Sequence, residues 1–125
     1  MIENFLILSC IGQTHKIGLR IKNNFYFYTI EQKENKHDHL VLNILNLLKK
    51  HKVILDNKFS IIVNIGPGNF SSIRTSLSVV KGMKISKKVS LYGFKNTDLR
   101  QFSLSNIELL IKKDLIQKNL IKPLY

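Results

Sequence analysis

The segment 65–74 combines glycines, serines and an arginine between a predicted strand and a predicted helix. Glycine permits tight backbone turns, and the N–H groups at the start of a helix face the preceding loop. Such a loop can hold an anion or contact a partner. It lacks the Gly-Lys-Ser/Thr of a Walker loop and the Gly-x-Gly-x-x-Gly of a dinucleotide site, so a tight turn with Ser71 as helix N-cap is the alternative. The candidate loop residues are Gly66, Pro67, Gly68, Asn69, Phe70, Ser71 and Arg74.

The predicted helix after this loop, about residues 71–86, has small side chains along one side. Small side chains allow another helix to approach closely, while the apolar residues Ile73, Leu77 and Val80 occupy a different sector suited to a sheet. We expect the stripe to receive a neighbour, either the helix that begins at Asp38 or a partner protein. The small-residue stripe, at spacing i, i+4, i+7, i+11, consists of Ser71, Thr75, Ser78 and Gly82.

The predicted helix that begins at Asp38 is apolar over more than one stripe. Leu42 lies well round the helix from Leu40 and Ile44, which suit the core. Surplus apolar surface indicates a partner-binding face that includes Leu42, unless the last helix of this chain covers it.

Other reactive side chains do not assemble into a catalytic or metal site in the sequence. Cys10 lies in an apolar strand and is interpreted as inert packing. His37 and His39 are two residues apart and would point to different sides of a helix start. A nuclease with two metals needs several carboxylates, and only Asp56 and Asp98 fall near plausible strand or loop ends. We therefore predict no catalytic residue, no metal and no cofactor.

The hydrophobic pattern predicts the element order βββαβαβα: a mixed five-stranded sheet with helices, in the α/β (α+β) class. Lobes of ribonuclease-H-like and actin-like ATPase proteins have this order. A brief helical turn is predicted at 99–102. The expected strands are 5–10, 16–22, 25–30, 59–65 and 89–93, and the expected helices run from Asp38 to about 49–52, from 71 to 86 and from 106 to 118.

Composition predicts a single domain over residues 1–125 in the cytoplasm. Hydrophobic residues make up 44% of the chain, no apolar run is long enough to span a membrane, and the start lacks a signal peptide's basic region. A lone cysteine fits a reducing compartment. The net charge of +12 comes mostly from lysines spread along the chain, which favours weak electrostatic steering over base-specific readout by arginine.

Several motifs resemble the TsaB (YeaZ) family. The run from Gly66 to Arg74, continued to Met83, is similar to the family's Gly-Pro-Gly-Ser-Phe-Thr-Gly-Leu-Arg…Leu-Ser…Lys-Gly-Leu signature. His37-Asp38-His39 resembles the family's His-Ser-Glu helix start, segment 89–94 its next strand, and Pro123-Leu124-Tyr125 its Pro-Leu-Tyr tail. The resemblance covers roughly residues 5–100 and the C-terminus.

The resemblance implies an actin-like (ASKHA, Gcp-like) fold and a non-catalytic role. Family members support TsaD, which makes threonylcarbamoyladenosine at adenosine 37 of tRNAs that read ANN codons, with TsaE as an accessory ATPase. The pairing surface of the family is built from its first two helices. The implied partners are thus TsaD-like and TsaE-like proteins, with tRNA met only through the complex, and a homodimer when TsaD is absent.

This chain departs from the family pattern in three places. Ser9 stands where active superfamily members carry an aspartate after the first strand, and Asn69 and Ser72 replace a serine and a glycine of the motif. The segment 103–125 is predicted as a helix and tail, and we expect it to take the place of the family's usual second lobe. A small basic tRNA-binding module and a degenerate ATP-binding lobe remain the alternative functions.

Overall fold

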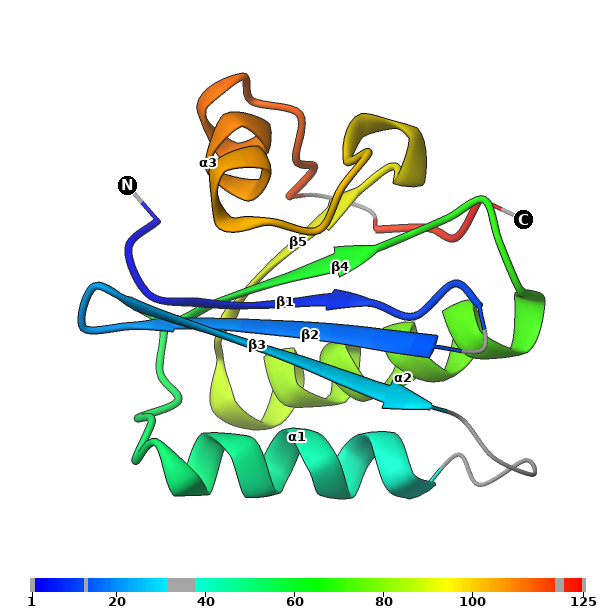
Figure 1. Ribbon diagram of the computed structural model, residues 1–125. Coiled ribbons are helices and arrows are strands. Elements are labelled where there is room, and N and C mark those ends of the chain that lie inside the picture. Colours follow the sequence, from blue (N-terminus) through cyan, green and yellow to red (C-terminus); the bar gives the residue numbers. More distant parts are fainter. Residues whose placement is uncertain (1, 13, 32–37, 119–120, 125) are drawn as a thin grey trace.

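A mixed five-stranded sheet forms the centre of the computed structural model, which describes residues 2–12, 14–31, 38–118 and 121–124 (Figure 1). The strand order is β3-β2-β1-β4-β5. The first three strands pair antiparallel with one another, whereas β4 pairs parallel with β1 and β5 pairs parallel with β4. The sequence-based fold class and element order are confirmed. The strands are β1 (Phe5–Ser9), β2 (Thr14–Ile21), β3 (Asn24–Glu31), β4 (Ser60–Asn64) and β5 (Ser90–Phe94).

The hairpin between β2 and β3 depends on its turn residues. Lys22 and Asn23 both have positive φ, 49° and 68°, the backbone shape that two-residue hairpins require. Further along, Gly18 packs against the Phe25 ring, where a Cβ would lie only 2.7 Å from the ring carbon Cζ. The sheet is therefore tightly packed along this hairpin.

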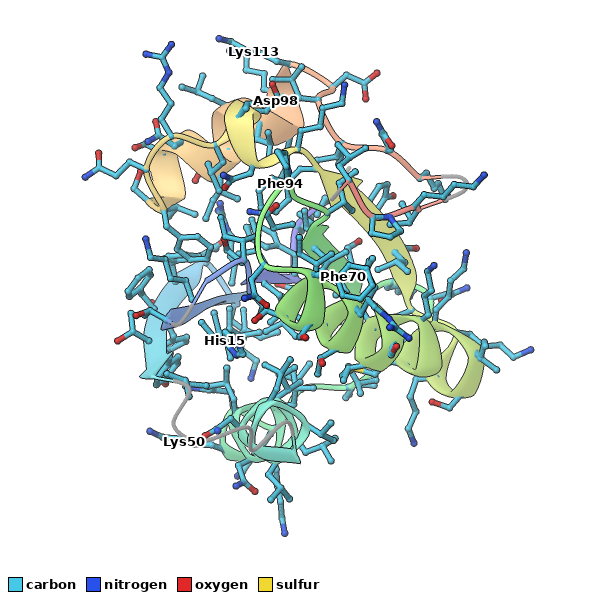
Figure 2. The ribbon with its side chains drawn as sticks, turned by 90° about the vertical axis from the view of Figure 1, so that its right-hand side faces the viewer. His15, Lys50, Phe70, Phe94, Asp98 and Lys113 are labelled. Carbon is cyan, nitrogen blue, oxygen red and sulfur yellow. The ribbon has the colours of Figure 1, made fainter. Side chains whose placement is uncertain are left out.

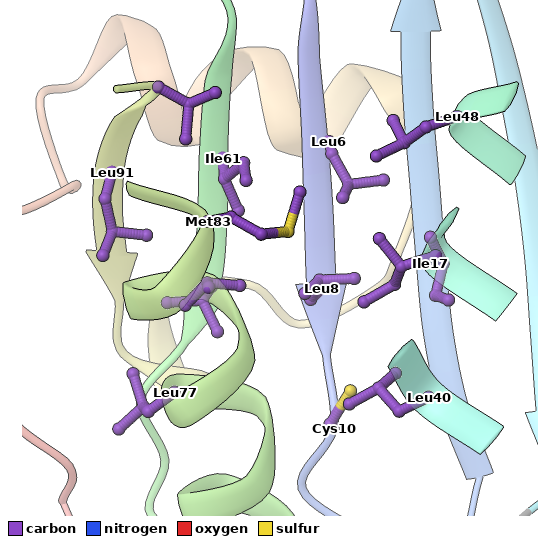
Figure 3. Close-up of a cluster of buried hydrophobic side chains, with 14 of the residues drawn as sticks. Leu6, Leu8, Cys10, Ile17, Leu40, Leu48, Ile61, Leu77, Met83 and Leu91 are labelled. Carbon is purple, nitrogen blue, oxygen red and sulfur yellow. The ribbon is translucent and has the colours of Figure 1, made fainter. Parts of the chain in front are cut away.

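Helices cover both faces of the sheet. α1 (Asp38–Lys50) and α2 (Phe70–Lys87) lie on one face, and the short η1 (Asn96–Asp98) and α3 (Leu104–Lys112) lie on the other (Figure 1). The larger core fills the space between the sheet and α1 and α2, and Figure 3 shows Leu6, Leu8 and Ile61 facing side chains from those helices. The smaller core, around Phe94 and Ile107, lies beneath α3. None of the helices within the described ranges is long and apolar enough to cross a membrane.

The C-terminal third differs from the sequence-based expectation. The last helix spans Leu104–Lys112 rather than 106–118, and the helical turn expected at 99–102 lies instead at Asn96–Asp98. Ser103 caps α3 by accepting the N–H of Asn106, and Asp114 then takes a left-handed conformation with φ 58° that ends the helical path. Beyond it, Gln117 forms a two-way backbone bridge with Gly93. The helical spacing of apolar residues continues through Leu115, which is why the sequence predicts a longer helix. In the structure the chain leaves the helix earlier, and Gln117 pairs with the edge strand β5 instead.

Candidate partner-binding face and motif loop

The Gly66 loop is held by backbone contacts with η1 and with the C-terminal segment. Leu124 N–H donates to the Ile65 carbonyl at 2.7 Å, and Asn96 N–H donates to the Gly66 carbonyl at 2.8 Å. Gly66 has φ +99°, and a Cβ there would collide with the Leu124 carbonyl oxygen. The Gly66–Pro67 peptide is cis. Only glycine therefore suits this position, and the loop and the tail form one packed unit.

Asn69, not Ser71, is the N-cap of α2, which corrects the sequence-based assignment. Its Oδ1 accepts the N–H of Ser72 at 3.0 Å, and its own N–H donates to the Ile11 carbonyl at 2.8 Å. Gly68 packs against Ile11, where a Cβ would lie 2.7 Å from the Ile11 Cβ. Asn69 is engaged in capping, and Gly68 packs closely on the connection between β1 and β2. These contacts favour a structural role for most of the loop residues over an open anion-binding site.

A buried polar cluster lies at the carboxyl ends of β1 and β4. Asn64 is 1% exposed, and its Nδ2 donates to Ser9 Oγ and to Asn96 Oδ1, each at 3.1 Å. Its Oδ1 accepts the Gly66 N–H at 2.8 Å. Neither Asn64 nor Asn96 stood out in the sequence as a site residue. An amide at the end of an otherwise apolar strand was the available signal, because a buried polar group must be hydrogen-bonded.

A cavity of about 290 Å³ adjoins this cluster. Ser9 and Asn96 line it from the buried side, and Lys16 and Arg100 supply its charged side chains. No carboxylate lines this cavity among the described residues. Its lining is thus basic and hydroxyl-bearing.

The two aspartates considered for a nuclease are not brought together. Asp56 precedes β4, whereas Asp98 lies in η1 after β5, at the opposite end of these parallel strands. Figure 2 shows Asp98 above Phe94, on the α3 side of the sheet. Among the described residues, no group of three or more His, Cys, Asp or Glu side chains is placed to hold a metal ion. His37 lies outside the described residues.

The small-residue stripe faces away from the core. Ser71, Ser78 and Gly82 are exposed, and Thr75 is half-buried with its Oγ1 donating to the Ser71 carbonyl at 2.9 Å. A Cβ at Gly82 would meet no atom within 4 Å. The suggestion that the helix beginning at Asp38 covers the stripe is therefore wrong: α1 lies beside α2 on the sheet and does not lie on its outer side.

Large side chains flank this stripe. Phe70 is 50% exposed, and the Arg74 guanidinium lies over its ring at 5.1 Å from the centroid. Figure 2 shows Phe70 at the start of α2. At the other end of the helix Ile85 is 80% exposed. The outer side of α2 thus offers a flat centre with bulky, partly apolar ends.

α1 has an apolar outer side that this chain leaves uncovered. Leu42 is 55% exposed and Leu45 is 49% exposed, whereas Leu40 and Ile44 are buried against the sheet. The alternative in which the last helix covers Leu42 is wrong, because α3 lies on the opposite face of the sheet (Figure 1). We call the outer side of α1, with Val41, Leu42 and Leu45, together with the small-residue stripe of α2, the two-helix face.

Gly82→Ala is expected to stabilise the isolated chain. Glycine inside a helix costs about 0.5–1 kcal/mol relative to alanine, and here the added methyl meets nothing. Urea denaturation should show a free energy of unfolding higher by about that amount. Gly93→Ala is the matched contrast, because its Cβ would lie 2.9 Å from Ile65 Cγ2. A decrease in stability for Gly82→Ala would contradict the open geometry of the stripe.

Cys10 is fully buried, and burial raises the pKa of its thiol to about 12. The reactive thiolate is therefore nearly absent at neutral pH. We expect Ellman's reagent to modify the native chain at least about 100-fold more slowly than the urea-unfolded chain. Because the pKa of Cys10 is higher in the folded chain than in the unfolded chain, the folded state also becomes less stable relative to the unfolded state as pH rises from about 9 towards 12. Rapid native labelling would contradict this placement.

His51 has partners that the sequence did not reveal. Its Nε2 lies 3.1 Å from the Tyr28 hydroxyl, and its ring centroid lies 4.1 Å from that of Tyr26. His15 is buried within β2. Both histidines are therefore part of the packed structure.

Comparison with solved structures places this arrangement among known folds. YeaZ from Pseudomonas aeruginosa superimposes with a TM-score of 0.64 at 19% identity, over 78% of this chain and 45% of that one. The chain has a ribonuclease-H-like fold. A structure described as an uncharacterized protein with similarity to peptidase YeaZ, also from P. aeruginosa, gives a TM-score of 0.67 at 19% identity, over 78% of this chain and 44% of that one.

RuvC from Thermus thermophilus, solved with a Holliday junction substrate, shares the ribonuclease-H-like fold with a TM-score of 0.55 at 9% identity, over 90% of this chain and 78% of that one. No family model matches the chain, and no curated protein sequence matches it significantly. The chain spans less than half the length of the YeaZ chain and of the YeaZ-similar chain. At these identities the likeness shows the ribonuclease-H-like fold and leaves function to be argued from the site.

Proposed function

We propose that this chain is a non-catalytic, TsaB-like subunit that binds a TsaD-like catalytic subunit through the two-helix face. It would thereby support threonylcarbamoyladenosine formation at adenosine 37 of tRNAs that read ANN codons. The observation that carries the proposal is the exposure of this face: small residues on α2 and leucines on α1 lie on the same side of the sheet, outside the core.

The chemistry of the two-helix face suits helix-to-helix association. Small residues let two backbones come close, and the exposed leucines supply apolar area worth about 25 cal/mol per Å² when buried. The motifs in α2 and its preceding loop resemble those of the TsaB family, and the fold likeness to YeaZ supports the same assignment. The absence of catalysis is part of the proposal: Ser9, held by Asn64, stands where a metal-binding carboxylate would be needed.

Co-expression with the TsaD-like protein of the same organism tests the proposal. We expect the two chains to co-elute on size exclusion as a heterodimer, and the modification of tRNA to depend on both. Persistence of separate peaks at micromolar concentrations, with both chains folded by circular dichroism, would refute the assignment. In the absence of that partner, self-association through the same face is expected.

The basic charge supports a second candidate, a small tRNA-binding module. The net charge is +12, and only one ion pair, Arg20 to Glu108 at 2.9 Å, occurs among the described residues. Titration of isolated tRNA at increasing salt separates the two functions. Tight binding that falls steeply with salt, without any TsaD-like protein, would favour the module. Calorimetric ATP binding would instead favour a degenerate ATP-binding lobe.

A further inference from the structure

A groove of about 530 Å³ lies between the C-terminal half of α2, the edge strand β5 and the C-terminal segment. Leu91 and Ile121, both nearly buried, line its apolar part. Ile85, which is 80% exposed, also lines the groove and extends this apolar surface to solvent. The groove therefore has an apolar interior that continues onto the surface of α2.

Four lysines complete the lining. Among the described residues no acidic or aromatic side chain lines the groove. All four lysines are exposed, and Lys118 Nζ lies 6.0 Å from the centroid of the Tyr92 ring. A bound anionic group would gain attraction from these cations. They come from two separate parts of the chain: Lys81, Lys84, Lys118 and Lys122.

The combination of an apolar interior and a cationic lining selects among anionic partners. A phosphate backbone would gain from the lysines but nothing from Ile85 or Leu91, and a single-stranded base would find no aromatic side chain in the lining on which to stack. An amphipathic helix matches both features, because its leucines bury apolar surface while carboxylates on its flanks meet the lysines. The chemistry thus favours a protein segment over a nucleic acid.

We propose that this groove is a docking site for an acidic amphipathic helix of a partner protein. The groove borders the two-helix face at Ile85, whereas Lys84 projects from α2 in a different direction from Gly82. Peptide binding is measured on the isolated chain and association with a TsaD-like subunit is measured by co-purification, so each proposed contact can fail without the other.

The probe is a fluorescein-labelled synthetic 16-residue peptide with leucines at helical i, i+4, i+7 and i+11 spacing and glutamates on the flanks. Fluorescence anisotropy with the full chain should give binding that is at least about 10-fold tighter than for a scrambled peptide of the same composition. The double variant Lys84→Glu with Lys122→Glu should weaken binding at least about 10-fold, because repulsion replaces attraction.

Two further variants distinguish binding in the groove from non-specific attraction to the basic surface. Ile85→Ser removes exposed apolar area only, so it should leave folding intact and weaken peptide binding about 3-fold or more. Lys58→Glu with Lys95→Glu makes the same charge change outside the groove and should alter affinity less than about 2-fold. Circular dichroism verifies folding for each variant.

Three outcomes would overturn the proposal. The first is equal binding of ordered and scrambled peptides, and the second is an equal loss for both pairs of lysine variants. The third is insensitivity to Ile85→Ser combined with displacement of the peptide by tRNA at lower concentration than by unlabelled peptide, which would identify a nucleic-acid surface instead. None of these outcomes depends on whether a TsaD-like protein binds the two-helix face.

Discussion

Thr75→Arg is expected to weaken association with the TsaD-like subunit at least about 100-fold while leaving the monomer folded. The substitution places a long, charged side chain in the middle of the small-residue stripe, where two helices are proposed to approach each other. The monomer should tolerate it, because Thr75 is half-buried on the outer part of α2 and its hydroxyl donates to the Ser71 carbonyl of the same helix. Co-purification and analytical size exclusion measure the effect.

Gly82→Glu should act in the same way about two turns further along α2. Gln101→Arg is the matched control, since it adds the same cation at an exposed position outside the two-helix face and should leave association unchanged. Gly82→Ala separates stability from association, because alanine should stabilise the isolated chain while it adds bulk to the small-residue stripe. Normal co-purification of Thr75→Arg and Gly82→Glu would remove the two-helix face from consideration.

Asn64→Ala is expected to lower the free energy of unfolding by about 3 kcal/mol. The Asn64 side chain makes three hydrogen bonds while almost fully buried: two from Nδ2 and one to Oδ1. Alanine would leave the Gly66 N–H without the side-chain acceptor that it has here and open a void between β1 and β5. Urea denaturation monitored by circular dichroism measures the loss.

Two comparison variants make the Asn64 prediction specific. Ser9→Ala removes one of the three bonds and should cost about 1 kcal/mol. Asn57→Ala changes an exposed amide before β4 and should cost less than about 0.5 kcal/mol. Equal effects at all three positions would mean that the cluster does not hold the Gly66 loop in place.

The order of strands and helices could be predicted from the sequence because each element has its own local pattern of apolar and polar residues. The continuous apolar run in β4 and the alternation in β2 identify strands at whatever position they occupy. The residues at which the helices begin and end were harder to predict from the sequence. Asn69 and Ser71 are both good cap residues, and only the packing of Gly68 on Ile11 shows why the helix starts at the earlier one.

The sequence by itself determined the element order, the small-residue stripe on one side of α2 and the excess of lysine, because these follow from residue type and spacing along a single stretch of chain. Tertiary structure alone decided that α3 lies on the far face of the sheet, that Asn64 joins Ser9 to Asn96, and that four lysines meet around one groove. These features join residues more than 30 positions apart. Net charge and local periodicity contain no information about which distant segments the core brings together.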